Sequence, residues 1–333
     1  MTIELPVLRL GLAGFSAAER SQIAAALPAA SPGAAQWELA RVSEADVWWV
    51  SGARAKLLPG DIVQVAPGAP TERALRLHLP DVDRPVAFSL PLACNGLVPA
   101  YSFDAGSRRS MSAVLEAFET WLSPLTAQFC LGSLVAEHEA ALGSGVFDVS
   151  ANGRLLAVVD MHGDVAVLPG STPADFEDAV WTRRESPGTP EHMKSVSMSQ
   201  LMWQYSTRTQ SDLLPRHYRA DLLYFRRAPR LPQRMLGDSH LLLIRELARG
   251  PAGFDALQRR TGIAAKQLAR HLAALYFVGS ITSNPKRAGP GQAPRAGEYD
   301  SLPNSSLPGR LDVAPLLPLA VADLTAPAWL GPR

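Results

Sequence analysis

Residues 266–282 read KQLARHLAALYFVGSIT, the pattern of a helix that ends near Gly279 and runs into a strand. The leucines recur at helical spacing, so the sequence predicts that one face of this helix lies in a core, at Leu268, Leu272 and Leu275. The same spacing places other side chains on the outer face, namely Lys266, Gln267 and Arg270. Glycine is a common residue just after a helix. The residues that follow it, SIT, are therefore predicted to begin a strand.

Two further helices are predicted before this one. Residues 238–250, DSHLLLIRELARG, form a helix capped by Asp238, with core positions at Leu242, Ile244 and Leu247. Residues 253–262, GFDALQRRTG, form a short helix that Gly262 closes. The pattern Leu268-x-x-His271-Leu272-x-x-Leu275-x-x-x-Gly279-x-Ile281 resembles the recognition helix and wing of bacterial winged-helix repressors, over residues 238–283.

That resemblance implies a DNA-binding transcription regulator. In the helix-turn-helix geometry Lys266, Gln267 and Arg270 would enter the major groove, where such side chains can read base edges. Two arginines at the end of the second helix would lie near phosphates, Arg259 and Arg260.

The sequence departs from these repressors at the end of the third helix, where Tyr276 and Phe277 stand in place of polar residues. Alanines at 264, 265, 269, 273 and 274 also predict an outer surface with few side chains that could read bases. These features favour a second hypothesis, in which the winged helix is a protein-contacting module and the aromatic pair meets a partner or a second copy.

The charge distribution is uneven. The net charge of the chain is +1, but residues 216–295 carry 15 Lys and Arg against 4 Asp and Glu, so that this segment alone carries +11. An acidic body joined to a basic end is typical of a protein that meets a polyanion, although the two parts could also attract each other.

Residues 1–109 are predicted to form an α/β domain. Strand candidates are VLRLGLAGF, WELARV, DVWWV, DIVQVAP and PVAFSLPL, and a helix begins at a capping box of Ser16 and Glu19. The order resembles the receiver domain of bacterial response regulators. The residues that such a domain uses for phosphoryl transfer are missing, because GFSAAE follows the first strand, Ser51 ends the third, and FSLPLAC has no lysine. The resemblance therefore implies a degenerate receiver used for contacts.

Residues 110–145 are predicted to be connecting helices that abut at Ser123 and Pro124. An apolar stripe on them, including Leu115, Phe118, Trp121 and Leu122, predicts a core face or a dimer face. Residues 146–237 are predicted to be an α+β middle domain. It begins with a three-stranded meander whose first turn is Asn152-Gly153, a strong hairpin signal. Helix candidates follow at TPADFEDAVW and SMSQLMWQYSTRTQ, and then a strand candidate at DLLYFRR.

Residues 284–333 are rich in Pro, Gly and Ser, which predicts a disordered tail with an apolar segment at 311–324 that could dock. No apolar run is long enough for a membrane span. Cys94 and Cys130 have no metal or redox spacing. The sequence thus predicts a cytoplasmic protein of mixed α/β and α+β architecture.

No motif of a catalytic site is present, so the sequence predicts no enzyme, no cofactor and no metal. One ligand hypothesis remains besides DNA and protein. Arginine pairs at Arg183-Arg184 and Arg226-Arg227 could hold the phosphates of a nucleotide second messenger of the cyclic di-GMP type.

Overall fold

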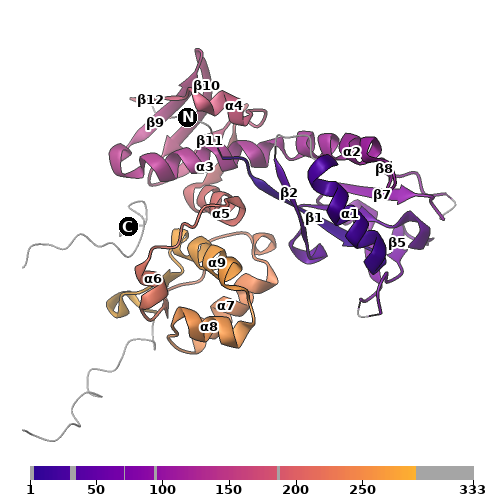
Figure 1. The fold of residues 1–333 in the computed structure, drawn as a ribbon. Coiled ribbons are helices and arrows are strands. Elements are labelled where there is room, and N and C mark those ends of the chain that lie inside the picture. Colours follow the sequence, from indigo (N-terminus) through magenta and orange to yellow (C-terminus); the bar gives the residue numbers. More distant parts are fainter. Residues whose placement is uncertain (1–3, 31–34, 71, 94–95, 186–187, 290–333) are drawn as a thin grey trace, which may run out of the picture. The chain divides into compact units, whose positions relative to one another are not determined.

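The computed structural model describes residues 4–30, 35–70, 72–93, 96–185 and 188–289. The chain forms two compact units, an N-terminal unit of Met1–Asp212 with Pro232–Asp238, and a C-terminal unit of Leu213–Leu231 with Ser239–Arg333. Both helices and several sheets are present, so the architecture is mixed α/β (Figure 1). The predicted docking segment at 311–324 lies outside the described residues.

The N-terminal unit begins with a parallel sheet of five strands in the order β2-β1-β3-β7-β8. Its strands are β1 (Val7–Ala13), β2 (Gln36–Ala40), β3 (Val47–Val50), β7 (Val86–Leu90) and β8 (Tyr101–Asp104). Renumbered along the chain, this order is 2-1-3-4-5, which is that of flavodoxin-like doubly wound folds. The strand β8 was not among the sequence predictions.

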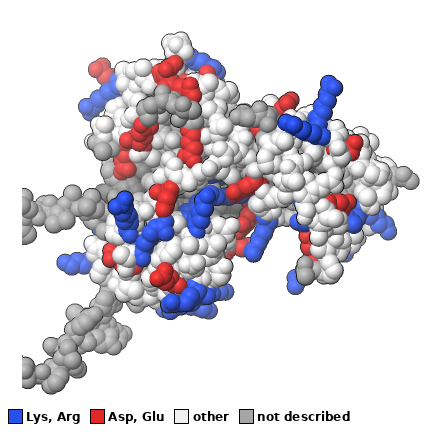
Figure 2. All heavy atoms as spheres, viewed as in Figure 1, with Lys and Arg blue, Asp and Glu red and all other residues white. Residues whose placement is uncertain are grey.

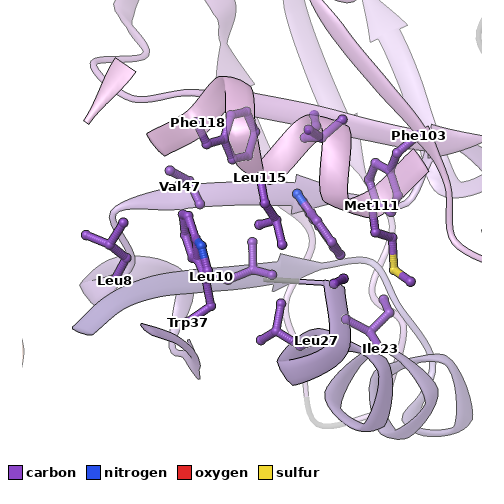
Figure 3. Packing of buried hydrophobic residues seen from close by; sticks show 14 of the residues in the cluster. Leu8, Leu10, Ile23, Leu27, Trp37, Val47, Phe103, Met111, Leu115 and Phe118 are labelled. Carbon is purple, nitrogen blue, oxygen red and sulfur yellow. The ribbon is translucent and has the colours of Figure 1, made fainter. Parts of the chain in front are cut away.

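Helices α1 (Ala17–Ala30) and α2 (Arg108–Trp121) pack on one face of this sheet (Figure 3). The core between them is apolar and closely packed, and it includes Leu8, Leu10, Ile23, Trp37, Met111, Leu115 and Phe118. The predicted capping box of α1 is confirmed, since the backbone N–H of Ser16 donates to Glu19 Oε2 at 2.6 Å and the Glu19 N–H donates to Ser16 Oγ at 3.3 Å. These bonds satisfy backbone donors that the first turn of a helix leaves open.

A small antiparallel sheet covers part of the other face. It consists of β4 (Ala55–Leu58), β5 (Ile62–Val65) and β6 (Leu75–His78), which follow a short 3₁₀ turn at Gly52–Arg54. Its apolar side chains meet the ends of the parallel strands in a second core, together with Ala13, Val50 and Phe88. The segment DIVQVAP is thus a strand as predicted, but it belongs to this small sheet and not to the parallel one.

Helix α3 (Ser123–Leu142) follows α2 directly, as the Ser123-Pro124 pair predicted. Leu115, Phe118 and Leu122 are buried, but Trp121 is 50% exposed and stands apart from their stripe. The stripe is therefore a core face of the unit, because the sheet and α1 already cover it.

The second half of the N-terminal unit is an antiparallel sheet in the order β12-β9-β10-β11-β13. Its strands are β9 (Val146–Ala151), β10 (Arg154–Asp160), β11 (Asp164–Val167), β12 (Val180–Arg183) and β13 (Lys194–Ser197). Helix α4 (Pro173–Glu177) lies between β11 and β12 in the sequence, and helix α5 (Met198–Arg208) follows β13. The predicted meander is confirmed, and its first turn has Asn152 at φ 51° and Gly153 at φ 75°. The helix predicted for TPADFEDAVW is half wrong: it ends at Glu177, and the β-formers after it pair with β9 as an edge strand.

A buried ion pair connects α5 with the parallel sheet. Arg208 Nη2 donates to Asp46 Oδ1 at 2.5 Å, and the backbone N–H of Arg9 donates to Asp46 Oδ2 at 2.9 Å. The side chains of Arg208 and Asp46 are only 9% and 10% exposed. Burial lowers the pKa of the Arg208 guanidinium, and the charge of Asp46 opposes that shift.

The C-terminal unit contains the predicted three helices, α7 (Asp238–Arg249), α8 (Phe254–Thr261) and α9 (Ala265–Phe277). Helix α7 buries Leu243 and Leu247, so Leu243 takes the core position expected for its neighbours Leu242 and Ile244. A short helix α6 (His217–Ala220) and strand β14 (Tyr224–Phe225) precede them, and β15 (Ile281–Thr282) follows.

Strand β15 pairs with the upstream strand β14, antiparallel, with Phe225 opposite Ile281. On the other side of β14, Leu223 bridges Ala252 in the connection between α7 and α8. Residues 213–231 therefore group with the three helices, whereas the sequence placed them in the middle domain that ends at 237. Within the described part of the chain, β15 starts no hairpin with a later strand, which differs from the predicted wing.

The predicted tail begins too early. Residues up to 289 are part of the folded unit: a 3₁₀ turn at Pro285–Arg287 is capped by Asn284, and the Gly289 N–H donates to Phe225 O at 2.8 Å. Pro and Gly here shape a tight turn rather than a loose segment.

Among the helices of the described residues, none is both long enough and apolar enough to cross a bilayer.

Candidate nucleic-acid interface

The turn between α8 and α9 is set by glycine. Gly262 ends α8 in the left-handed conformation at φ 68°, and its N–H donates to Gln258 O at 2.9 Å. Glycine takes this conformation without the steric penalty of a side chain. Three residues, 262–264, separate the two helices, so the last turn of α8 and the first turn of α9 are close in the sequence.

The two sides of α9 differ as the sequence predicted. Leu268, Leu272 and Leu275 are fully buried, while Lys266 and Gln267 are exposed. Arg259 and Arg260 are also exposed, in the last turn of α8. Arg270 is half-buried and takes part in an interaction, so it is less available than the other four.

Three basic side chains of this surface form no ion pair within the described residues. Across the part of the chain that the structure describes, no carboxylate forms an ion pair with Arg259, Arg260 or Lys266. On the face drawn in Figure 2, Lys and Arg side chains gather over the elements of the C-terminal unit. An exposed and unneutralised basic surface attracts polyanions.

The alanines of α9 do not form the plain outer surface expected from the sequence. Ala269, Ala273 and Ala274 are buried, at 4%, 2% and 0% exposure. Neighbouring residues of the unit cover these alanines as well as the leucine stripe of α9. The small alanine side chains allow those neighbours to approach the helix closely. The exposed residues of α9 are consequently concentrated in its first turn, at Ala265, Lys266 and Gln267.

The aromatic pair at the end of α9 packs inside the unit. The ring of Tyr276 lies 5.1 Å from that of Tyr218 in α6 and 5.4 Å from that of Phe277, with both pairs edge-on. Phe277 is only 7% exposed and Tyr276 is half-buried. Internal packing thus accounts for the departure from the repressor pattern, and a protein-contacting surface does not follow from these two residues.

A histidine pair was not foreseen from the sequence. His271 Nδ1 lies 3.0 Å from His240 Nε2, which joins α9 to α7. One of the two nitrogens must carry a proton and donate it, while the other accepts. The spacing within each helix does not predict this pair, because His240 and His271 are 31 residues apart and belong to different helices.

The four arginines of the nucleotide hypothesis are not brought together within one unit. Arg183 and Arg184 belong to the N-terminal unit, where Arg184 Nη1 donates to Asp148 Oδ1 at 2.8 Å. Arg226 and Arg227 belong to the C-terminal unit, at the end of β14. Arg184 therefore has a structural role that needs no ligand.

The position at which a receiver accepts a phosphoryl group is closed in this chain. Ser51 is 1% exposed and its N–H donates to Ala13 O at 2.9 Å. The backbone of Gly68 lies directly on that of Phe15, since a Cβ at Gly68 would stand 2.0 Å from Phe15 O. The segment after β5 thus covers the carboxyl end of β1, at the edge of the sheet where ligands of such folds bind.

Incubation with acetyl phosphate and magnesium is expected to add no phosphoryl group to residues 1–95. The acceptor position is a buried serine, and no carboxylate cluster follows the first strand. Intact-mass measurement checks this result, with a phosphorylation-competent receiver in a parallel reaction as the control. A stable adduct mapped within residues 1–95 would contradict the assignment of a degenerate receiver.

Among the described residues, no group of three or more His, Cys, Asp or Glu side chains could hold a metal ion. His138, between two glutamates in the sequence, lies edge-on to the Trp181 ring at 6.1 Å. Burial raises the pKa of the Cys130 thiol to about 12, so this cysteine is an unreactive core residue.

Comparisons of the chain with protein-family models, curated proteins and solved structures gave no match.

Proposed function

We propose that this protein is a non-catalytic regulatory protein whose C-terminal unit binds duplex DNA as a winged-helix module. The observation that carries the proposal is the exposed basic surface of Arg259, Arg260, Lys266 and Gln267, which stands on two consecutive helices and lacks carboxylate partners in the described chain. Such a surface at the start of a recognition helix suits the major groove and its flanking phosphates.

The N-terminal unit would serve as a contact module. Its 2-1-3-4-5 parallel order supports the receiver-like interpretation, and its closed carboxyl edge supports the absence of phosphoryl chemistry. A DNA-binding role would place the protein in the cytoplasm.

The proposal is tested with Lys266→Ala and with Arg259→Ala/Arg260→Ala, on a duplex selected from a random pool by the wild-type protein. Lys266→Ala is expected to weaken binding by about 1–3 kcal/mol and to relax the preference at one base position, if its contact is to a base edge. The double arginine variant is expected to weaken binding to all duplexes and to lower the salt slope, by about one unit for each phosphate that it no longer reaches.

Arg245→Ala is the matched control, because Arg245 is an exposed arginine of the same unit, on α7 and outside the proposed surface. It should leave affinity unchanged. The contrary outcome is DNA binding that is absent, or indifferent to Lys266, Arg259 and Arg260. Loss of a dimer or a protein partner in Tyr276→Ala and Phe277→Ala, with the fold retained, would then favour the protein-contacting module.

A further inference from the structure

The chain beyond β15 turns around the end of β14. Arg226 donates its backbone N–H to Ser280 O at 2.8 Å on the β15 side of the strand, and Phe225 O accepts from Gly289 N on the other side. Gly289 approaches so closely that a Cβ there would stand 2.9 Å from Arg226 O. The 3₁₀ turn at Pro285–Arg287 is thereby held next to Arg226 and Arg227.

Four arginines follow one another at this place, which we call the arginine row: Arg287, Arg226, Arg227 and Arg230. Burial lowers the pKa of Arg226, and the charge of Arg287 lowers it further. Burial also lowers the pKa of Arg227, with further lowering by Arg226 and Arg230. The guanidinium groups of Arg226 and Arg227 therefore lie near those of Arg287 and Arg230.

No carboxylate is among the groups that shift the pKa of Arg226 or Arg227; only Tyr218 opposes the shift at Arg226. Nε of Arg227 is buried and has no hydrogen-bond partner in the described chain. The repulsion between these guanidinium groups and the unpaired Nε of Arg227 both lower the stability of the unit. An external anion would supply the missing acceptor of Arg227, because a guanidinium binds phosphate oxygens with two parallel hydrogen bonds.

We propose that the arginine row binds the sugar–phosphate backbone of duplex DNA. It would be a second contact surface of the C-terminal unit, in addition to the start of α9. Cations gathered at one place attract a polyanion, and the phosphates of duplex DNA recur along each strand. The inference rests on the proposed DNA-binding function. It adds a contact that carries no sequence information and that lies on β14 and the turn after β15, outside the three helices.

The test uses the full chain with Arg226→Gln, Arg227→Gln and Arg230→Gln combined, and duplex affinities measured at several salt concentrations. Each phosphate that is no longer neutralised lowers the slope of log affinity against log salt by about 0.9, so the slope of the triple variant should fall by about 2 to 3 units. The decrease should be the same for the selected duplex and for an unrelated one. The corresponding triple lysine variant keeps the charges and should retain most of the slope, whereas Arg245→Gln should keep all of it.

The failure of this inference and that of the proposed function are distinguishable. If the triple glutamine variant keeps the wild-type salt slope while Lys266→Ala weakens binding, the row does not bind the DNA backbone. The assignment of DNA contact to helices α8 and α9 then stands. A decrease for one duplex alone would also overturn the row, because it would mean base reading. If the row variant weakens binding and the variants at Lys266, Arg259 and Arg260 do not, the row holds and the helix assignment is wrong. A wild-type protein that binds no duplex overturns both.

Discussion

Asp46→Asn is expected to lower the free energy of unfolding of the N-terminal unit by about 3–5 kcal/mol. The carboxylate is 10% exposed and holds Arg208 Nη2 at 2.5 Å, while its second oxygen accepts from the Arg9 backbone at 2.9 Å. An asparagine can keep only one of these bonds, because its amide oxygen accepts but its amide nitrogen only donates. In either orientation that nitrogen would face another donor, the Arg208 guanidinium or the Arg9 N–H. Arg208 would remain buried with an uncompensated charge. Urea unfolding of the full chain, followed by far-UV circular dichroism, measures the change.

Asp46→Leu/Arg208→Met is the control for this result. The double variant has neither buried charge, so it loses the attraction between Asp46 and Arg208 but also avoids the cost of burying an unpaired guanidinium. It should therefore be far more stable than Asp46→Asn. Asp83→Asn is a matched surface control, since Asp83 pairs with Arg84 but is 53% exposed, and it should change stability little. If Asp46→Asn is as stable as the wild type, the ion pair does not hold α5 to the sheet.

Local signals in the sequence predicted the elements whose determinants lie within a few residues. The capping box at Ser16 and Glu19, the turn at Asn152-Gly153 and the helix stop at Gly262 all appear as predicted. The leucine stripe of α9 predicted which side is buried. In each of these cases the interacting groups are neighbours in the chain, so the local sequence pattern is enough to predict the contact.

What the sequence did not predict depends on partners far apart in the chain. The strand candidate DLLYFRR contains β14, but the pairing of β14 with β15, Phe225 opposite Ile281, joins segments on either side of the three helices, and no local pattern predicts it. Arg208 and Asp46 lie 162 residues apart. The burial of Ala269 and Ala273 likewise depends on what packs against α9, whereas helical periodicity separates only one face from the other.

The candidate site was predicted in part for the same reason. Exposure of Lys266 and Gln267 follows from the leucine spacing and is observed. The arginine row was half visible, because Arg226 and Arg227 are adjacent in the sequence. Arg287 joins them only through the turn after β15, in residues that the composition assigned to a disordered tail.

Gly68→Ala is expected to destabilise the N-terminal unit by about 3 kcal/mol, at the upper end of what overpacking usually costs. A Cβ at this position would lie 2.0 Å from Phe15 O and 2.2 Å from the Phe15 carbonyl carbon. Both are backbone atoms, so no side-chain rotation can relieve the overlap. Either the segment after β5 moves off the end of β1 or the strand itself shifts, and both changes open the core around Val65.

Gly170→Ala is the control, because it adds the same methyl group to the same unit at a position where nothing lies within 4 Å. It should leave the midpoint of unfolding almost unchanged or raise it slightly, since alanine restricts the unfolded chain. Thermal and urea unfolding compare the two variants. A Gly68→Ala protein as stable as Gly170→Ala would mean that the small sheet does not rest on the carboxyl end of β1. The contact between Gly68 and Phe15 would then not close the edge of the sheet next to Ser51.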